Sequence, residues 1–595
     1  HPKFRPPGGH PGAKFTCDYR NMKDWYPCST PMNRGCWLRH PNGSEFNIHT
    51  DYENQAPIGI DRYYTLDVHD SWLNPDGLNS TQSKLFNNTY PGPWIQACWG
   101  DRVHINVTNH MKHNGTSIHW HGIRQLNSMQ MDGVNGVTQC PIAPGDHFVY
   151  SFNTTQYGSS WYHSHYSVQY ADGLQGPLTI HGPTSADFDE PKDPLIVSDW
   201  GHNSAFDAIY QGLKAPSILL NGVGNVTRFN NSIQAQLPIP KTYELHFEQQ
   251  PYQHSKKYLL RIINTSFDST FVISIDNHWL QIVSADFVPI VPYYNTSLLV
   301  GIGQRYNVIV EARPEAGPAN PLPKDKNFWI RTWVPDGCSV DQGAPGYEKN
   351  GILRYDPSST AAPQSQQWPN IALVCSDEDA ASLKPILPWQ VGSSANGDDG
   401  QRFAVTLNRT GGTPIFPLAR FAFDMTADFR PLQINYSDPI FLHLNDFSGN
   451  WPVQWAVIPE NYTSDDWVYL ALTGNNASTT FGTHPIHLHG HDFAILQQAE
   501  NQRYPDDPSK LQLNLQNPAR RDVVLLPTNG FIVIAFKSDN PGNWLLHCHI
   551  AFHASEGLAF QILERQADAN ALWPHGDSPA LAEAERVCGN WDKWY

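Results

Sequence analysis

Residues 547–553 read HCHIAFH, with histidine and cysteine side chains at close spacing. In a β-strand, side chains two positions apart point to the same face, so His547 and His549 can present two imidazoles to one site. Imidazole is a ligand for zinc, copper, iron and nickel. Cys548 sits between these histidines, and His553 follows it five residues later. The stretch therefore predicts a strand that holds metal ligands.

The same H-x-H spacing recurs along the chain. This histidine content gives about one such pair by chance. The sequence contains five, at His119/His121, His163/His165, His487/His489, His489/His491 and His547/His549. No pair occurs between residues 166 and 486. We therefore expect a metal site where the first and last parts of the chain meet, held in place by the middle part.

These pairs have two alternative interpretations. A single H-x-H is more often an accident of surface or packing than a ligand pair, but four separate pairs flanked by aromatic and apolar residues argue against coincidence. A zinc site usually takes four ligands in tetrahedral geometry. Eight paired histidines exceed one zinc site and favour a metal cluster.

A further set of ligands surrounds Cys548. One cysteine with two histidines in a trigonal arrangement is typical of a blue-copper electron-transfer site, whose potential is tuned by the axial ligand. His484 and His553 are the nearby histidines, and Leu558 follows ten residues after the cysteine. Leucine in the axial position cannot coordinate, so we expect a raised potential. The alternative for Cys548 is a disulfide, but the chain has nine cysteines and removing this one leaves an even eight.

Composition limits the classes of protein. The chain has 595 residues with 43 glycines and 48 prolines, and 40% of its residues are hydrophobic but only 16% charged. This favours β-sheets and turns over helical bundles, and it excludes disorder for most of the chain. The formal net charge of -17 makes nucleic acid a poor partner. No apolar run approaches the roughly 18 residues of a membrane span.

Alternating hydrophobic segments punctuated by glycine, proline and asparagine predict many short strands. Examples lie at 63–68, 102–107, 195–200, 258–263, 307–310, 522–526 and 531–536. Strands at such spacing are typical of β-sandwiches or barrels. Residues 356–363, DPSSTAAP, predict a linker. Three blocks with this same pattern of short predicted strands indicate three domains, within the range of about two to four that the length allows.

Several features predict a secreted, extracellular glycoprotein. The chain begins at His1 without an initiator methionine, so we expect that a leader was removed. Many N-x-[ST] triplets are candidate glycosylation sites. They begin at Asn42, Asn79, Asn87, Asn106, Asn114, Asn153, Asn225, Asn230, Asn264, Asn295, Asn408, Asn435, Asn461 and Asn476.

Four motifs resemble a known family. HWHG at 119–122, WYHSH at 161–165, HPIHLHG at 484–490 and HCHIAFH at 547–553 resemble, in order, the four copper motifs of the multicopper oxidases. The chain is most similar to the ascomycete-type fungal laccases, over roughly residues 28–595. The resemblance implies an all-β fold of three consecutive cupredoxin-like Greek-key β-sandwich domains. We place them at 1–183, with an N-terminal extension, at 184–362, without copper, and at 363–595.

The resemblance also implies four copper ions and their ligands. The type 1 copper takes His484, Cys548 and His553, with Leu558 in the axial place. The type 2 copper takes His119 and His487. The two type 3 coppers take His121, His163 and His549 in one case, and His165, His489 and His547 in the other. His491 is left over and is interpreted as a supporting or structural residue. His110 and His278 match no motif and are interpreted as ordinary polar residues.

The implied activity is that of a laccase (benzenediol:oxygen oxidoreductase). Phenols or aromatic amines lose one electron at a time at the type 1 copper near His553, and Cys548 passes the electrons to the trinuclear cluster, where dioxygen is reduced to water by four electrons. Asp101 resembles the family acid near the type 2 copper and would assist proton delivery to oxygen. Asp268 matches a position where laccases place an acid that accepts the phenol proton. We expect a monomer.

The family pattern also suggests disulfides: Cys28–Cys36, Cys140–Cys588 and Cys338–Cys375. Cys17 and Cys98 remain and would pair with each other. Cys140–Cys588 would tie the C-terminal end to the first domain and limit separation of the two halves of the cluster. The family's usual Asp-Ser-Gly-Leu tail does not follow Tyr595, so either a C-terminal plug was removed or this member lacks one.

Other functions compete with that of a laccase. Bilirubin and ascorbate oxidases usually have methionine where Leu558 stands. A ferroxidase needs acids around the type 1 histidine edge, and Asp268 keeps that alternative open. A methionine-rich cuprous oxidase is disfavoured by the presence of only 6 methionines. A copper carrier without enzymatic activity would lack the trinuclear ligands, whereas all eight are present.

Overall fold

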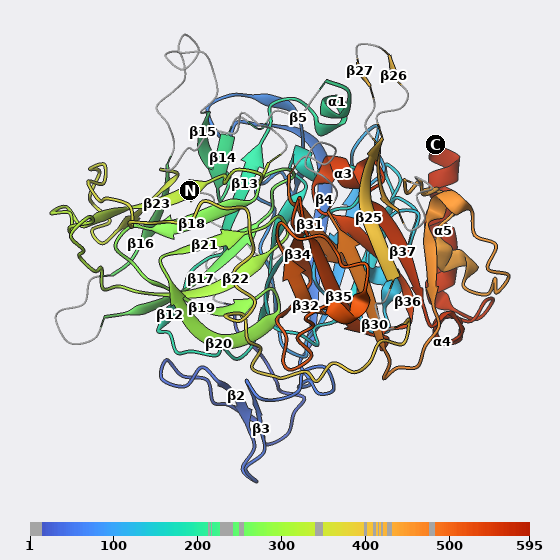
Figure 1. Cartoon of the computed structure of the whole chain (residues 1–595), viewed down its shortest axis with the longest axis horizontal. Coiled ribbons are helices and arrows are strands. Elements are labelled where there is room, and N and C mark those ends of the chain that lie inside the picture. The colour runs from blue at the N-terminus through green and yellow to red at the C-terminus, as the bar shows by residue number, and fades with distance from the viewer. Residues whose placement is uncertain are drawn as a thin grey trace.

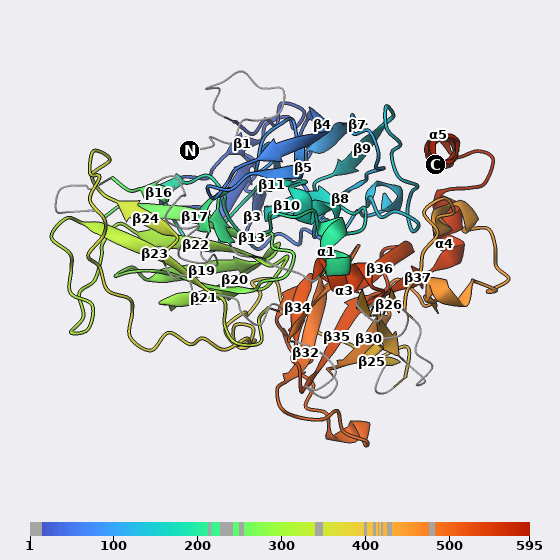
Figure 2. The ribbon, with the colours of Figure 1, turned by 90° about the horizontal axis from the view of Figure 1, so that it is seen from above.

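Strands dominate the computed structural model of the protein (Figure 1). The structure describes residues 15–211, 215, 217–226, 242–248, 255–339, 349–397, 401–408, 412–413, 416–417, 420–424, 431–474 and 482–595. Figure 2 separates three groups of strands by colour: blue to cyan, green, and orange to red. The all-β prediction is confirmed.

The first group follows a small N-terminal sheet of β1 (Tyr26–Pro27), β2 (Cys36–Arg39) and β3 (Glu45–Asn47). One sheet has the order β5-β4-β7-β9, with β4 (Asp61–Leu73), β5 (Ser80–Phe86), β7 (Arg102–Asn109) and β9 (His147–Asn153). The other has the order β6-β11-β10-β8, with β6 (Ile95–Cys98), β8 (Ile118–Trp120), β10 (Gly158–Ser164) and β11 (Gln175–His181). One apolar core lies between them.

The alternation predicted for residues 102–107 is the physical reason for strand β7. Val103, Ile105 and Val107 are buried, whereas the residues between them are exposed or partly exposed. Period-two burial is what a strand with one face on a core produces. The predicted segment 63–68 lies within β4 in the same way.

The middle group also consists of two sheets. The larger contains β12 (Glu190–Pro191), β13 (Leu195–Trp200), β14 (Ser217–Leu220), β15 (Val223–Val226), β17 (Lys257–Asn264), β19 (Leu280–Ala285), β20 (Val288–Asn295) and β22 (Arg305–Glu311). The smaller contains β16 (Tyr243–His246), β18 (Phe271–Ile275), β21 (Ser297–Val300), β23 (Asn327–Trp333) and β24 (Gly351–Arg354).

The last group repeats the arrangement. One sheet contains β25 (Gln401–Asn408), β28 (Arg420–Asp424), β30 (Trp467–Thr473), β32 (Phe493–Ala499), β33 (Arg520–Arg521) and β35 (Phe531–Lys537). The other contains β29 (Val457–Glu460), β31 (His484–Leu488), β34 (Val523–Leu526), β36 (Gly542–Cys548) and β37 (Ala559–Glu564). A short hairpin joins β26 (Gly412–Thr413) to β27 (Phe416–Pro417).

Helices are few among the described residues, and all but α5 are short. They are α1 (Ala205–Gln211), α3 (Ala551–Ser555), α4 (Gln566–Leu572) and α5 (Pro579–Trp594), with 3-10 turns η1 (Met129–Met131), η2 (Gln169–Asp172), η3 (Ile440–His443), η4 (Val453–Trp455) and η5 (Pro508–Lys510). In this part of the chain, no helix has both the length and the apolar character needed to cross a membrane.

The stretch predicted as a linker, residues 356–363, contains neither helix nor strand. The chain that follows it is nevertheless fixed between the middle and last groups of strands. Asp377 accepts hydrogen bonds from the Gln304 side chain at 2.7 Å and from the Leu525 backbone at 2.8 Å. The stretch from 356 to 397 therefore works as a strap that joins two sandwiches.

Disulfides join the cysteine pairs that we expected: Cys17–Cys98, Cys28–Cys36, Cys140–Cys588 and Cys338–Cys375. Cys548 is free and buried. The Cys140–Cys588 bond fixes helix α5 against the first group of strands. Val587 and Trp591 of this helix enter the first core. The last helix of the chain is thus part of the first sandwich.

Candidate metal centre

The first group of candidate ligands is built on the last pair of sheets. Strand β31 begins at His484, β36 ends at Cys548, and helix α3 carries His553. The Cys548 Sγ lies 3.6 Å from His484 Nδ1 and 3.7 Å from His553 Nδ1, and the two imidazole nitrogens are 3.2 Å apart. All three side chains are buried. One sulfur and two nitrogens therefore point to a common centre.

Leu558 lies beside this group. Its side chain is fully buried, and its carbonyl accepts a hydrogen bond from the Cys548 backbone at 3.0 Å. Burial raises the pKa of the Cys548 thiol above its usual range. A cation bound among the three donors would favour the thiolate in spite of this burial.

Eight other histidines come together from the first and last sandwiches. Strand β10 pairs with β8 so that His163 lies opposite His119, and β31 pairs with β36 so that His487 lies opposite His547. The remaining four histidines come directly after these strands. Donor atoms lie within 4.8 Å of one another in three groups: His119, His121 and His487; His121, His163 and His549; His165, His489 and His547.

Hydrogen bonds fix which nitrogen of each ring faces the centre. His119 Nδ1 lies 2.9 Å from the carbonyl of Asp132, and His487 Nδ1 lies 2.8 Å from the carbonyl of Asp522. A carbonyl only accepts, so each Nδ1 carries the proton and each Nε2 keeps its lone pair. The two Nε2 atoms face each other at 3.4 Å.

A second pair of nitrogens has the same arrangement. His547 Nδ1 lies 2.9 Å from the carbonyl of Cys548, and His489 Nδ1 lies 2.8 Å from a carboxylate oxygen of Asp132. Their Nε2 atoms are 3.2 Å apart. Lone pairs at such distances repel each other unless a cation lies between them. This donor set therefore fits metal ions held by neutral imidazoles.

Burial keeps these imidazoles neutral. Desolvation lowers the pKa of His487 and His489 well below the usual value, and the neighbouring histidines lower it further. Burial likewise lowers the pKa of His484 and of His547 to about 4. Neutral rings offer their lone pairs to a metal at physiological pH, since no proton has to be displaced.

The acid beside the histidine cluster is Asp132, which the sequence interpretation missed. Its carboxylate lies 2.8 Å from His489 Nδ1 and 3.2 Å from His119 Nδ1. Asp132 lies eleven residues after the first H-x-H motif, directly after the turn η1. The SMQMDGV sequence around it contains no spacing that marks a ligand partner. The one available signal is that this acidic residue stands between two apolar residues, Met131 and Gly133.

Asp101, predicted as the acid near the type 2 copper, has other partners in the structure. Its carboxylate is fully buried, forms an ion pair with Arg62 at 2.7 Å and accepts hydrogen bonds from the backbones of Ile60 and Cys98. Within the described part of the chain, the hydrogen bonds and the ion pair of this carboxylate involve no histidine of the cluster. These donors occupy both carboxylate oxygens, so Asp101 fixes the turn after β6 beside the Cys17–Cys98 bond.

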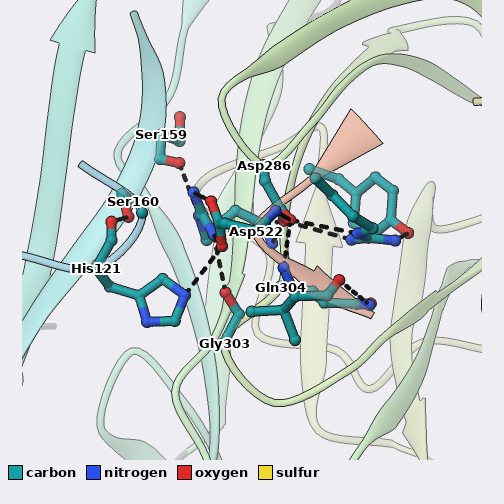
Figure 3. Close-up of polar contacts among 12 residues, drawn as sticks. His121, Ser159, Ser160, Asp286, Gly303, Gln304 and Asp522 are labelled. Carbon is teal, nitrogen blue, oxygen red and sulfur yellow. Dashed lines mark hydrogen bonds and ion pairs between the residues drawn. The ribbon is translucent and has the colours of Figure 1, made fainter. Parts of the chain in front are cut away.

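A second acid, Asp522, connects the cluster to a buried charge network (Figure 3). Its Oδ1 lies 3.2 Å from His121 Nε2, and its Oδ2 accepts a hydrogen bond from Arg305 Nη2 at 2.7 Å. Asp286 accepts hydrogen bonds from the Arg305 backbone at 3.0 Å and from the Arg521 side chain at 3.3 Å. The charges of two arginines and two aspartates thus compensate each other. This network lies between the middle and last sandwiches, beside His121.

Asp268 lies on the loop that packs against helix α3. The carbonyl of the preceding Phe267 accepts a hydrogen bond from the Ala551 backbone at 3.0 Å, and Ser339 donates to the Asp268 carboxylate. The carboxylate of Asp199, in β13, accepts a hydrogen bond from the backbone N–H of Asp268 at 3.0 Å. Burial and the charge of Asp268 raise the pKa of Asp199 to about 7. The structure therefore brings Asp268 into the surroundings of His553.

The histidines outside the motifs have other partners. His491 is buried and lies 2.9 Å from Glu564, and His278 is buried between the Asp276 carbonyl and the Tyr355 hydroxyl, each at 2.8 Å. His110 lies near the surface, 3.2 Å from Asp67. His278 and His491 are thus both paired with protein groups.

The candidate glycosylation sites differ in exposure. Asn42, Asn79, Asn153, Asn435 and Asn461 are exposed, and Asn87, Asn106, Asn114 and Asn295 are partly exposed. Asn264 is fully buried and its amide donates to the carbonyls of Ser269 and Val300, so a glycan does not fit there. Asn230 and Asn476, and the side chains of Asn225 and Asn408, lie outside what the structure describes.

Comparison with known families agrees with this geometry. Three family models, each described as multicopper oxidase, match residues 67–185, 192–358 and 423–568. The chain belongs to the multicopper oxidase family.

Known relatives narrow the class further. A laccase of Arthroderma benhamiae is 43% identical, with 97% of this chain and 89% of the relative covered. Laccase-2 of Botryotinia fuckeliana is 43% identical, with 95% and 91% covered. The crystal structure of the laccase from Botrytis aclada superposes with a TM-score of 0.82 at 41% identity, covering 95% of this chain and 97% of that chain. The chain is thus of the laccase type.

Proposed function

We propose that this protein is a secreted laccase that oxidises phenols and aromatic amines with dioxygen. The observation that carries the proposal is the position of Cys548. It belongs to the group with His484 and His553, while its sequence neighbours His547 and His549 belong to two separate histidine groups. Consecutive residues at the end of strand β36 would thus join a substrate-oxidising centre to an oxygen-reducing centre.

The proposed copper ligands follow these groups. His484, Cys548 and His553 would hold type 1 copper, with Leu558 in the axial place. His119 and His487 would hold type 2 copper. His121, His163 and His549 would hold one type 3 copper, and His165, His489 and His547 the other. Bound copper would supply one-electron oxidation of the substrate at the type 1 site and four-electron reduction of dioxygen to water at the other three ions.

The chain's own residues would position these groups and take up protons. The carbonyls of Asp132 and Asp522 fix the rings of His119 and His487 with their Nε2 atoms turned inward. Asp268 would take the hydroxyl proton of a phenol docked near His553, which makes loss of an electron easier. Asp132, rather than Asp101, would serve as the acid beside the histidine cluster.

Three domains remain our proposal for the chain, at 1–183, 184–362 and 363–595. The pairs of sheets and the three separate family matches support this division. Secretion is supported by four disulfides, which persist in oxidising compartments, and by the exposed sequons. We propose that the enzyme works as a monomer.

A ferroxidase would use the same copper centres with ferrous iron as substrate. The surroundings of His553 favour an organic ring instead. The Phe421 ring lies 4.1 Å from the His553 ring, centre to centre, and Phe552 packs near Phe267. These buried rings make the surroundings of His553 apolar, whereas a ferrous ion needs oxygen ligands.

Oxygen consumption by the copper-loaded protein tests this proposal. Oxidation of 2,6-dimethoxyphenol, an aromatic amine and ferrous iron would be measured in parallel, with the visible spectrum as a report on the copper–thiolate bond. We expect fast turnover of the two organic substrates and slow turnover of iron. A Cys548→Ser variant should lose both the blue colour and turnover. Faster oxidation of iron than of phenols would favour the ferroxidase.

A further inference from the structure

A pocket of about 370 Å³ lies apart from the metal centre. Its walls come from the N-terminal segment 15–38, from strand β11 and the residues after it, and from strands β17, β19 and β22 of the middle group. None of the proposed copper ligands lines it. A cavity of this volume is in the range that binds small organic molecules.

The charge of this pocket is opposite to that of the whole protein. The chain has 56 acidic residues against 39 lysines and arginines. The lining nevertheless contains the two arginines Arg34 and Arg261 and neither aspartate nor glutamate. A cavity with two guanidinium groups and no acid in its walls attracts an anion.

Arg261 is the buried arginine of the pocket. Its side chain is only 4% exposed, and within the described chain its hydrogen bond is to the carbonyl of Lys192, at 2.9 Å. A guanidinium has five N–H donors, so further donors are available to a ligand. Burial lowers the pKa of Arg261 to about 10, with a partial offset from the charge of Asp193. A buried charge of this kind is stabilised by a bound anion.

Arg34 contributes a second guanidinium from the N-terminal segment. Its Nε donates to the carbonyl of Phe188 at 2.9 Å, and its Nη2 donates to the carbonyl of Asp189 at 3.1 Å. The guanidinium lies 4.2 Å from the centre of the Phe188 ring. These contacts hold Arg34 in place as a preorganised part of the wall.

Aromatic rings form much of the remaining surface. Phe15, Trp37, Tyr157 and Phe188 all line the pocket. The Phe15 ring lies 5.1 Å from the His181 ring in a stacked arrangement. Flat apolar walls of this kind favour a flat ligand, because stacked and edge contacts between rings add to the apolar area that is buried.

We propose that this pocket binds a small aromatic carboxylate. The carboxylate would pair with the Arg261 guanidinium, whose planar fork matches two carboxylate oxygens, and the ring would pack against the aromatic walls. The site is separate from the proposed oxidation of phenols, and its occupation needs no copper. By joining the N-terminal segment to strands of the middle group, the ligand would also stabilise the fold.

The probe for this site is 4-fluorobenzoate, which has neither a hydroxyl nor an amine for the copper centre to oxidise. Its binding to the copper-loaded full chain would be measured by fluorine NMR and calorimetry. The neutral isostere 4-fluorobenzamide serves as the comparison. We expect the benzoate to bind at least about tenfold more tightly than the benzamide, because a site built to pair with a charged group rejects an analogue that lacks it. Equal affinities, or no binding of the benzoate, would overturn the proposal.

Variants then test the assigned residues. Arg261→Met should weaken benzoate binding at least about tenfold, and Arg261→Lys should weaken it less, since lysine keeps the charge but loses the fork. Arg313→Met is the matched control, because it removes the same charge from a side chain that is 66% exposed and outside this pocket. If Arg261→Met does not fold, Arg34→Gln must weaken binding for the proposal to stand.

Two further readouts separate this pocket from other binding modes. Turnover of 2,6-dimethoxyphenol by Arg261→Met should equal that of the unchanged protein, because the residue lies outside the copper centre. Unchanged benzoate binding in both arginine variants would place the probe elsewhere and overturn the assignment. Displacement of the probe by inorganic phosphate at equal concentration would show a general anion site and overturn the aromatic part of the proposal.

Discussion

Asp132 connects the two halves of the histidine cluster through His489. The Nδ1 of His489 lies 2.8 Å from an Asp132 carboxylate oxygen, across 357 residues of sequence. The backbone carbonyl of the same residue accepts from His119 Nδ1 at 2.9 Å. One residue of the first sandwich thus fixes the ring orientation of histidines from both sandwiches, and with it the nitrogen that each offers to a metal.

Replacing Asp132 tests that relationship. Asp132→Ala removes the carboxylate that orients His489 and leaves the carbonyl that orients His119. We expect a loss of about 10–100-fold in copper affinity of the histidine cluster or in oxygen consumption, as is usual for residues that orient metal ligands. Copper per chain and the rate of oxygen uptake measure the two effects. The blue absorption should persist, because Cys548 has other partners.

Asp101→Ala is the matched control for this prediction. Asp101 is also a buried aspartate of the first sandwich, but its carboxylate pairs with Arg62 rather than with a histidine of the cluster. We expect this variant to keep its copper and to unfold at lower denaturant concentration. Slower oxygen uptake by copper-loaded Asp101→Ala, with an unchanged rate in Asp132→Ala, would favour Asp101 as the acid that delivers protons to oxygen.

The contrast between these two aspartates shows what the sequence can predict. H-x-H spacing is local, because two side chains on one strand face are already neighbours in the sequence. It therefore predicted all eight cluster histidines that the structure brings together. Alternating hydrophobicity likewise predicted strands β4 and β7, since burial on one face leaves a period-two pattern.

Partners that approach from distant parts of the chain leave no such pattern. The role of Asp132 depends on a ring 357 residues away. Asp522 contacts Arg305 across 217 residues, and their pairing depends on how two sandwiches dock. The sequence also predicted residues 356–363 as a linker, correctly for secondary structure, but their composition gave no indication of the strap that continues to residue 397.

The Arg305–Asp522 ion pair should contribute strongly to stability. Both side chains are almost completely buried, so Arg305→Met leaves the Asp522 charge without its main partner. Removing one member of a buried ion pair costs about 3–5 kcal/mol. Equilibrium unfolding in urea measures this, with Arg313→Met as the exposed control, for which a change within about 0.5 kcal/mol is expected. Equal effects in the two variants would contradict the network shown in Figure 3.

Asp199 should give the protein a pH-dependent stability. Its pKa is raised from 3.8 to about 7, chiefly by burial and then by the charge of Asp268. The folded state therefore holds this proton more tightly than the unfolded state. The resulting stabilisation is complete below the unfolded pKa and is lost as pH rises through the folded value.

Asp199→Asn isolates this contribution, because asparagine stays neutral at every pH. The free energy of unfolding of the unchanged protein, minus that of the variant, should fall between about pH 4 and pH 7 and then level off. Urea unfolding at a series of pH values measures the difference. A constant difference across this range would show that Asp199 titrates normally. The lost hydrogen bonds to the backbone of residues 267–269 would shift that difference by a constant amount without changing its slope.

Asp268 should distinguish phenols from substrates that release no proton. The carboxylate lies on the loop whose Phe267 carbonyl accepts a hydrogen bond from helix α3, the helix that carries His553. Asp268→Asn keeps the size of the side chain but cannot accept a phenol proton. We expect kcat/KM for 2,6-dimethoxyphenol to fall by about 10²–10⁴, the usual contribution of a positioned base. Oxidation of a non-phenolic dye should change far less, because electron loss from such a dye needs no base.

Equal losses on the two substrates would mean that Asp268 acts through the structure of the loop. A matching fall in the blue absorption would trace the damage to the His553 group.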